Sequence, residues 1–287
     1  MRQIFLGVGQ MQQWLRNTEP AELLNQLSYC GADFIEMIVM KKELESQLQW
    51  MNMAWERNLK TSFHAPYFAE YELAGFEPKE GNAVREAHYH LFSKIAEFCE
   101  EKGYRGRVNL HCATSSSMPY ADLMALSVDY FSWLSQERVR NGWNLEYVIE
   151  LLPVNTAKKL KIGQKTSDLI KLREKLGSVL EGFCWDLGHY QWNIHKYGNS
   201  DVSSSFFRNV RHVHIHDFKE MTFGMDHCPL NFGLVPWERY LTKLPKKGDI
   251  YLVLELDYRN TQICGEAISE CLNSFKKIKN YNLKIKN

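Results

Sequence analysis

Short apolar and β-branched runs alternate with longer segments of mixed polarity along the whole chain. Runs of this kind, bounded by polar or turn residues, are typical of strands. The segments between them are long enough for one helix and two loops, which a crossover between parallel strands needs. The eight predicted strands are Gln3–Val8, Asp33–Val39, Lys60–His64, Arg107–Cys112, Tyr147–Leu152, Gly182–Leu187, His212–Asp217 and Ile250–Leu256.

Several of the segments between the strands carry helical signals. From Asn82 to Lys102 the apolar residues recur at spacings of three and four, and Gly103 follows as a stop signal. Asn17-Thr18-Glu19-Pro20 and Lys165-Thr166-Ser167-Asp168 have the residue types that open helices. The last helix is expected over Ala267–Lys277, and a Lys-rich tail at about 278–287 is expected to be solvated.

This repetition of strand and helix predicts an α/β protein with a single (β/α)8 TIM barrel, one domain over residues 1–287. No Pro-, Gly- or Ser-rich linker divides the chain. The alternative is an open doubly wound sheet, which would need a glycine-rich turn after the first strand to bind a nucleotide. The one candidate turn, Gly7-Val8-Gly9-Gln10, lacks the third glycine, so the barrel is preferred.

Composition narrows the classes of function. The chain has 35 Lys and Arg against 34 Asp and Glu, so nothing in the total charge indicates nucleic-acid binding. No apolar run reaches the ~18–20 residues that span a bilayer, and the start of the chain does not resemble a signal peptide. The seven cysteines are scattered without a CxxC motif, which indicates reduced thiols in a cytoplasmic protein.

Acidic and histidine residues gather at the carboxyl ends of the predicted strands, where enzymes with this fold have their active sites. Alternation along the seventh strand places His214 opposite Val213 and Ile215, so its imidazole is expected to point into the barrel mouth. The residues at these ends are His64, His111, Glu150, Asp186, His189, His214, His216 and Glu255.

This concentration of ligand-type residues predicts a metal site. Carboxylates are costly to bury without partners, and they repel one another when they are close. A divalent cation removes both problems, and imidazole with carboxylate but without thiolate suits Zn²⁺, Mn²⁺, Co²⁺ or Fe²⁺. A lone His or Asp at a strand end is more often structural, but here six successive strands end in such residues.

The predicted ligands are Glu150, Asp186, His214, Glu255, His64, His111, His189 and His227, with His216 as a second candidate on the seventh strand. The other histidines, His88, His90, His195 and His212, are interpreted as surface or helix residues.

Two motifs in succession, Trp185-Asp186-Leu187-Gly188-His189 and Val213-His214-Ile215-His216-Asp217, resemble the xylose isomerase-like TIM barrels. That superfamily includes sugar-phosphate isomerases and epimerases, and also apurinic endonucleases of the endonuclease IV type. Further matching segments are Ile149-Glu150-Leu151-Leu152-Pro153, Leu254-Glu255-Leu256 and Asp226-His227-Cys228-Pro229-Leu230 with Phe232-Gly233. The resemblance runs from about His64 to Glu255.

The two branches imply different sites. In the isomerase and epimerase branch one cation would be held by Glu150, Asp186, His214 and Glu255. Glu150 and Glu255 would also be the catalytic residues that exchange the proton, and His189 would contact the sugar.

The endonuclease branch holds three zinc ions. Its added ligands match His64, His111, His189 and His227, and Tyr67 matches a ring that this branch places near the DNA. The chain departs from this branch at Met225, where an Asp is expected, and at Leu187-Gly188, where Thr-Cys is usual.

The preferred interpretation is a divalent-metal-dependent isomerase or epimerase acting on a sugar or sugar phosphate, with one ion of manganese, zinc or cobalt. The residues expected to bind substrate are His189, Tyr67, His216 and Trp185. Trp14, Phe63 and Trp192 are candidates for an apolar wall, and Lys158, Lys159, Lys161 and Lys165 for contact with a phosphate.

The alternative is an endonuclease IV-like zinc phosphodiesterase acting on abasic DNA with up to three ions. It explains the surplus histidines better, but it explains the few basic residues near the site worse. A barrel that only binds a ligand is a third interpretation, and the complete Glu–Asp–His–Glu set argues against it. No membrane contact is expected, nucleic acid is a partner only under the alternative, and a homodimer is an open expectation.

Overall fold

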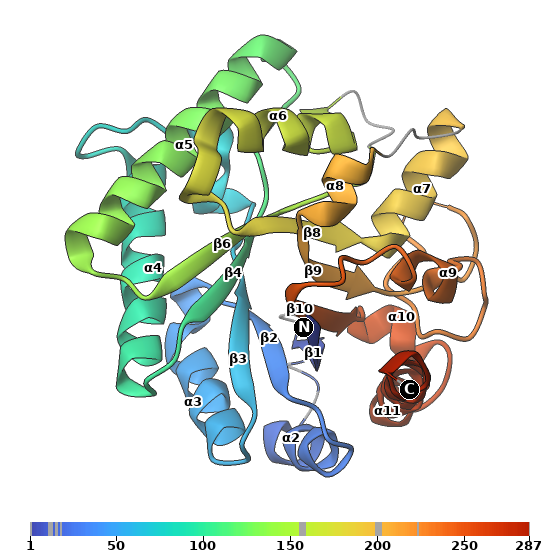
Figure 1. Cartoon of the computed structure of the whole chain (residues 1–287). Coiled ribbons are helices and arrows are strands. Elements are labelled where there is room, and N and C mark those ends of the chain that lie inside the picture. The colour runs from blue at the N-terminus through green and yellow to red at the C-terminus, as the bar shows by residue number, and fades with distance from the viewer. Residues whose placement is uncertain are drawn as a thin grey trace.

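Eight parallel strands close into a barrel with helices around it (Figure 1). The computed structural model describes residues 2–10, 14, 17, 19–154, 159–198, 203–222 and 224–286. The strands are hydrogen-bonded in the order β1-β10-β9-β8-β6-β4-β3-β2, and β1 also pairs with β2, so the sheet is closed. Their bounds are β1 (Arg2–Gln10), β2 (Phe34–Ile38), β3 (Lys60–His64), β4 (Gly106–Leu110), β6 (Leu145–Glu150), β8 (Gly182–Asp186), β9 (Val210–Ile215) and β10 (Gly248–Glu255). The predicted (β/α)8 barrel is confirmed.

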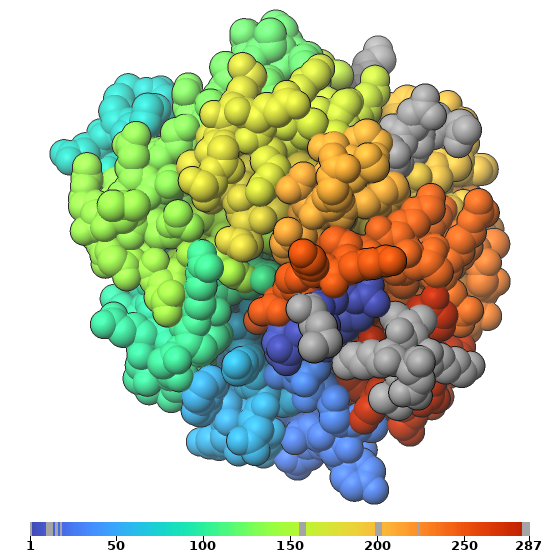
Figure 2. Space-filling model, viewed as in Figure 1, coloured from blue at the N-terminus to red at the C-terminus, as the bar shows by residue number. Residues whose placement is uncertain are grey.

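Helices connect successive strands and cover the outside of the barrel. The longer ones are α2 (Pro20–Tyr29), α3 (Leu44–Trp55), α4 (Ala83–Glu101), α5 (Tyr120–Asn141), α6 (Thr166–Leu176), α7 (Leu187–Tyr197) and α11 (Ala267–Lys286). Single-turn helices are α8 (Ser204–Arg208), α9 (Trp237–Leu241) and α10 (Tyr258–Gln262), and the 3-10 turns are η1 (Lys41–Glu43), η2 (Ala69–Tyr71), η3 (Leu73–Gly75) and η4 (Gly177–Val179). In Figure 2 the colours from blue to red follow one another around the molecule, as expected when consecutive strand–helix units are neighbours.

Two features differ from the prediction. The last helix does not end at Lys277 but continues to Lys286, and Ile278 on it is only 2% exposed. The segment that was expected to be a solvated tail therefore belongs to this helix up to Lys286, and it begins with a buried apolar residue. The short strands β5 (Thr114–Ser115) and β7 (Leu160–Lys161) form an antiparallel pair that the pattern did not indicate, because two residues are too few to show alternation.

The register of the strands brings the predicted site residues to one rim. Asp186 pairs with His214 across β8 and β9, and Gly9 pairs with Glu255 across β1 and β10. A Cβ atom at Gly9 would lie 3.3 Å from Glu255 Cγ, so the glycine leaves room for this carboxylate.

Two expectations about the environment can be compared with the structure. The described part of the chain contains no helix that is both long and apolar enough to cross a membrane. The seven cysteines are unpaired, as their spacing predicted.

Candidate metal centre

Four side chains of ligand type meet at the carboxyl end of the barrel. Glu150, Asp186 and Glu255 are the last residues of β6, β8 and β10, and His214 is next to last on β9. His214 Nδ1 lies 2.9 Å from Glu255 Oε2, and it lies 3.7 Å from both Glu150 Oε2 and Asp186 Oδ2. All four residues are 5% exposed or less. Side chains from four separate strands therefore converge on one point.

The atoms at this point face a shared position rather than one another. Within the described residues, His214 Nδ1, Asp186 Oδ2 and Glu255 Oε2 are buried and have no hydrogen-bond partner. Leaving one such atom unsatisfied costs about 1–3 kcal/mol, so three in close proximity need a common partner. Each can present a lone pair, and a divalent cation accepts from carboxylate and imidazole alike. The residues present therefore fit a metal ion.

Asp186 is held in place by the start of α7 and by His216. Its Oδ1 accepts a 2.6 Å hydrogen bond from the backbone N–H of His189, which caps the helix. His216 Nδ1 accepts from the backbone N–H of His227 at 3.0 Å, so Nε2 carries the proton and donates to Asp186 Oδ1 at 3.1 Å. Burial alone would raise the pKa of Asp186, but His189 and His216 hold it well below its usual range.

The glycine in the motif around Asp186 has a steric role. A Cβ atom at Gly188 would lie 2.0 Å from Cε1 of His216. Any side chain at this position would displace the imidazole that donates to Asp186, so the motif needs glycine here.

Imidazoles surround Glu150. His64 Nε2 and His111 Nε2 lie 3.2 and 3.3 Å from its Oε2, and His189 Nδ1 lies 3.2 Å from its Oε1. The side chain of Asn109 also donates to Oε2. Burial alone would raise the pKa of Glu150, but the imidazoles, His111 first, hold it well below its usual range. Burial also lowers the pKa of His64, but the hydrogen bond that His64 donates to the Glu150 carboxylate reverses this effect and raises the pKa to about 9.

His227 approaches Glu255 from the loop after β9. Its backbone φ is +53°, in the left-handed region that residues with a side chain seldom adopt. Its Nδ1 lies 3.6 Å from Glu255 Oε2, and its ring centroid lies 5.7 Å from that of His189. Burial alone would raise the pKa of Glu255, but His214 and His227 lower it to about 2. Glu255 is therefore ionised at neutral pH.

The structure brings all of the predicted ligands to one rim. Around Glu150, Asp186 and Glu255, ligand atoms lie within 4.8 Å of one another in overlapping groups of three: His64, His111 and Glu150; Glu150, Asp186 and His189; His189, His216 and His227; and Asp186, His216 and Glu255. Neighbouring groups share Glu150, Asp186, His189 or His216, so the rim has donors for one ion and for more than one.

A cavity of about 550 Å³ is lined by six of the eight predicted ligands: His64, His111, Glu150, His189, His227 and Glu255. Tyr67 and Phe68 are on its wall, and the Tyr67 ring stacks on His111 with centroids 4.1 Å apart. Lys159 and Lys161 of the β7 segment also line it. Lys159 Nζ pairs with Glu72 Oε1 at 2.6 Å, while burial and the charge of Lys159 lower the pKa of Lys161. The cavity thus joins a carboxylate and imidazole floor to an aromatic wall and two amines.

Some residues predicted to bind substrate lie away from this cavity. Trp185 is fully buried and packs on Tyr190 and Phe206 at centroid distances of 5.5 and 6.1 Å. Alternate residues of a strand face opposite sides, and Asp186 takes the inner side of β8. His216 is also fully buried, and its partners are Asp186 and the backbone of His227. Neither Trp185 nor His216, both predicted to bind substrate, is among the described residues that line this cavity.

The predicted aromatic wall and lysine cluster are also smaller than expected. Trp14, Phe63 and Trp192 are buried in the hydrophobic core, which leaves Tyr67, together with Phe68, at the cavity. Lys165 is exposed, and it is not one of the residues that line the cavity in the described part of the chain. Lys158 lies outside the described residues.

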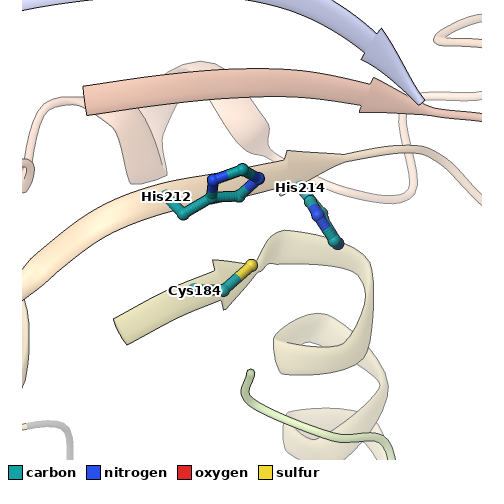
Figure 3. Close-up of side chains that lie close together, drawn as sticks. All are labelled: Cys184, His212 and His214. Atoms are coloured by element: carbon teal, nitrogen blue, oxygen red, sulfur yellow. The ribbon is translucent and has the colours of Figure 1, made fainter. Parts of the chain in front are cut away.

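Sequence reasoning missed two buried residues next to His214. Glu36 on β2 is 2% exposed, and its carboxylate approaches both His214 and His212. His212 is not a surface residue as expected but is fully buried on the inner side of β9, which its alternation with His214 could have indicated. Figure 3 shows His212 and His214 on β9 and Cys184 on the neighbouring β8, with the sulfur directed toward the imidazoles.

A family model of xylose isomerase-like TIM barrels matches residues 24–278. The chain belongs to the xylose isomerase-like TIM barrel family. The match covers most of the chain and agrees with the motifs on β8 and β9 that suggested this family. No curated protein matches the sequence.

Several solved structures share the fold over nearly the whole chain. A D-allulose 3-epimerase from Methylomonas sp. is 13% identical with a TM-score of 0.67, covering 97% of this chain and 98% of its own. A xylose isomerase domain protein from Alicyclobacillus acidocaldarius is 14% identical with a TM-score of 0.66, covering 98% and 100%. A D-psicose 3-epimerase from Clostridium cellulolyticum H10 is 10% identical with a TM-score of 0.65, covering 96% and 99%. At these identities the likeness concerns the fold.

Proposed function

We propose that the protein is a divalent-metal-dependent isomerase or epimerase of a sugar or sugar phosphate. The observation that carries the proposal is the convergence of His214 Nδ1, Asp186 Oδ2 and Glu255 Oε2, all buried and without hydrogen-bond partners in the described chain, beside a cavity that Glu150 and Glu255 line. Two of the similar structures are a D-allulose 3-epimerase and a D-psicose 3-epimerase, and their activities support the same reaction class.

Glu150, Asp186, His214 and Glu255 would hold the cation. When bound, the ion supplies electrophilic polarisation of the substrate carbonyl and neutralises negative charge that develops on its oxygen.

The proton transfers belong to Glu150 and Glu255. Both pKa values are lowered, so both carboxylates are ionised at neutral pH and can accept a proton. Glu150 is on β6 and Glu255 on β10, with β8 and β9 between them in the sheet. One carboxylate can therefore remove the proton next to the carbonyl, and the other, once it has taken up a proton from solvent, can add that proton from a second direction. A polarised carbonyl makes that C–H bond acidic enough for a carboxylate to act as the base.

Other residues would bind and orient the sugar. His189 lines the cavity beside Glu150, and the neighbouring Asp186 and Glu150 raise its pKa against the effect of burial. His189 is therefore placed to hydrogen-bond a substrate oxygen. Tyr67 and Phe68 offer apolar ring faces to the C–H groups of a sugar.

Deuterium exchange tests this function directly. The metal-loaded protein is incubated with a panel of ketoses and their phosphates in D₂O, and deuterium is located by NMR. The proposal predicts deuterium at the carbon next to the carbonyl with at least one substrate, and loss of this exchange in Glu255→Gln. No exchange with any member of a broad panel, by protein that has bound its metal, would contradict it.

The overlapping histidine groups favour a second candidate. His64, His111, His189 and His227 provide more imidazoles than a single ion needs. Several zinc ions could generate hydroxide for attack on a phosphodiester, as in endonuclease IV-type enzymes. Close to three zinc ions per chain, together with nicking of abasic DNA that Glu255→Gln abolishes, would establish this candidate and displace the first.

A further inference from the structure

Glu36 is a buried carboxylate with three polar neighbours on two other strands. Its Oε1 lies 2.8 Å from Nε2 of His214, its Oε2 lies 2.9 Å from Nε2 of His212, and Ser62 Oγ donates to Oε2 at 3.1 Å. The register supports this arrangement because Glu36 pairs with Ser62 across β2 and β3. A carboxylate this deeply buried is costly unless it is well partnered, so each of these contacts offsets part of its desolvation.

The contact between Glu36 and His214 determines which nitrogen of the imidazole is available. An ionised carboxylate can only accept hydrogen bonds, so His214 Nε2 must carry a proton and donate it. In the neutral ring Nδ1 then carries the free lone pair, and this atom faces Glu150, Asp186 and Glu255. The same contact also fixes the rotation of the ring.

We infer that Glu36 is a positioning residue that presents His214 to the metal ion through Nδ1. This inference rests on the proposed function, because it assigns a role toward the ion that His214 would bind. A carboxylate hydrogen-bonded to the outer nitrogen of a ligating histidine also makes that histidine a stronger electron donor.

The neighbouring thiol does not offer a better explanation of these histidines. Cys184 Sγ lies close enough to His212 and His214 for the three to form a possible ligand group. His214, however, already has its Nε2 hydrogen-bonded to Glu36 Oε1, and His212 Nε2 lies 2.9 Å from Glu36 Oε2. The contacts with Glu36 therefore account for the orientation of both imidazoles without a ligand role for the thiol.

Two substitutions at Glu36 test the inference, with Ser62→Ala as the control. Glu36→Met keeps the approximate length and removes both acceptor oxygens. Glu36→Gln keeps the shape and leaves one oxygen for two imidazoles. Ser62→Ala removes a donor to the same carboxylate but leaves the contact with His214. The readouts are the Kd for Mn²⁺ by titration, the visible absorption spectrum of the Co²⁺-loaded protein, and the far-UV circular dichroism of each variant.

We expect Glu36→Met to weaken Mn²⁺ binding about 10- to 100-fold and to change the Co²⁺ spectrum, with Glu36→Gln between it and the wild type. Ser62→Ala should stay within about threefold of the wild type. If Glu36→Met does not fold, Glu36→Gln alone decides. Wild-type affinity and an unchanged Co²⁺ spectrum in a folded Glu36 variant would overturn the inference and leave the proposed function intact. A wild-type protein that binds no divalent ion at all would instead overturn the proposed function.

Discussion

His214 and Glu255 lie on neighbouring strands, and His214 Nδ1 is 2.9 Å from Glu255 Oε2. Neither of these two atoms has a hydrogen-bond partner among the described residues. Two acceptors can be this close when both face a third, positively charged partner. A cation bound between these two atoms would make Glu255 a metal ligand as well as the base in the proposed reaction.

Glu255→Gln should separate these two roles. The amide keeps an oxygen for the ion but cannot accept the proton, so we expect substrate deuterium exchange to fall about 10²- to 10⁴-fold. Metal binding should weaken but remain measurable. Glu238→Gln, an exposed position on α9, is the control and should retain wild-type exchange. Equal exchange rates in Glu255→Gln and the control would remove Glu255 from the proton transfer.

Gly188→Ala should disturb the metal site without touching a ligand. The new methyl group would overlap His216, which donates to Asp186. We expect a loss of about 1–3 kcal/mol in the free energy of unfolding, as for other overpacked sites, and weaker metal binding. Urea denaturation and metal titration measure the two effects. His195→Ala on the exposed side of the same helix should change neither, and an unaffected Gly188→Ala would show that His216 does not support Asp186.

Lys161→Gln should distinguish phosphorylated from unphosphorylated substrates. Lys161 lines the cavity, whereas Lys165 is exposed, although the sequence suggested both for a phosphate. Loss of one charged hydrogen bond costs about 1.5–3 kcal/mol, so KM for a sugar phosphate should rise at least about tenfold in Lys161→Gln. Steady-state kinetics should show no comparable rise in Lys165→Gln or with the unphosphorylated sugar. An unchanged KM for every substrate would exclude Lys161 from phosphate binding.

The buried His88 predicts acid sensitivity that is independent of the metal site. Its Nε2 donates to the Tyr71 carbonyl and its Nδ1 accepts from the Tyr130 hydroxyl, so the neutral ring is satisfied. Burial lowers the pKa of His88 from 6.5 to about 4. As the pH falls below 6.5, the unfolded chain binds the proton first, so the folded state loses up to about 3 kcal/mol by pH 4.

Urea denaturation of the wild type and of His88→Gln is measured from pH 7.5 down to pH 4.5. The difference between their free energies of unfolding isolates the contribution of His88. We expect the wild type to lose more stability than the variant over this interval. Parallel pH profiles for the two proteins would show that His88 does not carry the effect.

The sequence predicted the barrel because its signals repeat in every strand–helix unit. Each of the eight predicted runs overlaps a barrel strand, and α4 begins at the cap that the pattern indicated, where Asn82 accepts from the Arg85 N–H. The short β5–β7 pair had no such repetition. Asp186, His214 and Glu255 could be predicted because each is a ligand-type residue at a strand end, which is where the fold places its sites.

The predictions that failed concern the direction of side chains and contacts between distant segments. Trp185 adjoins a site residue in sequence, yet it lies on the other side of the strand. Glu36 had no local signal, because a lone acid within a buried strand shows its purpose only when His212 and His214 are seen beside it. Such contacts form only when the barrel closes, so the residue pattern of a single strand does not predict them.

The most direct test of the central claim is anomalous scattering from a crystal of the protein loaded with Mn²⁺ or Zn²⁺. We expect a peak within about 2.0–2.3 Å of His214 Nδ1 and of carboxylate oxygens of Glu150, Asp186 and Glu255. A metal-saturated crystal with no peak among these four residues, or with one only beside Cys184 and His212, would contradict it.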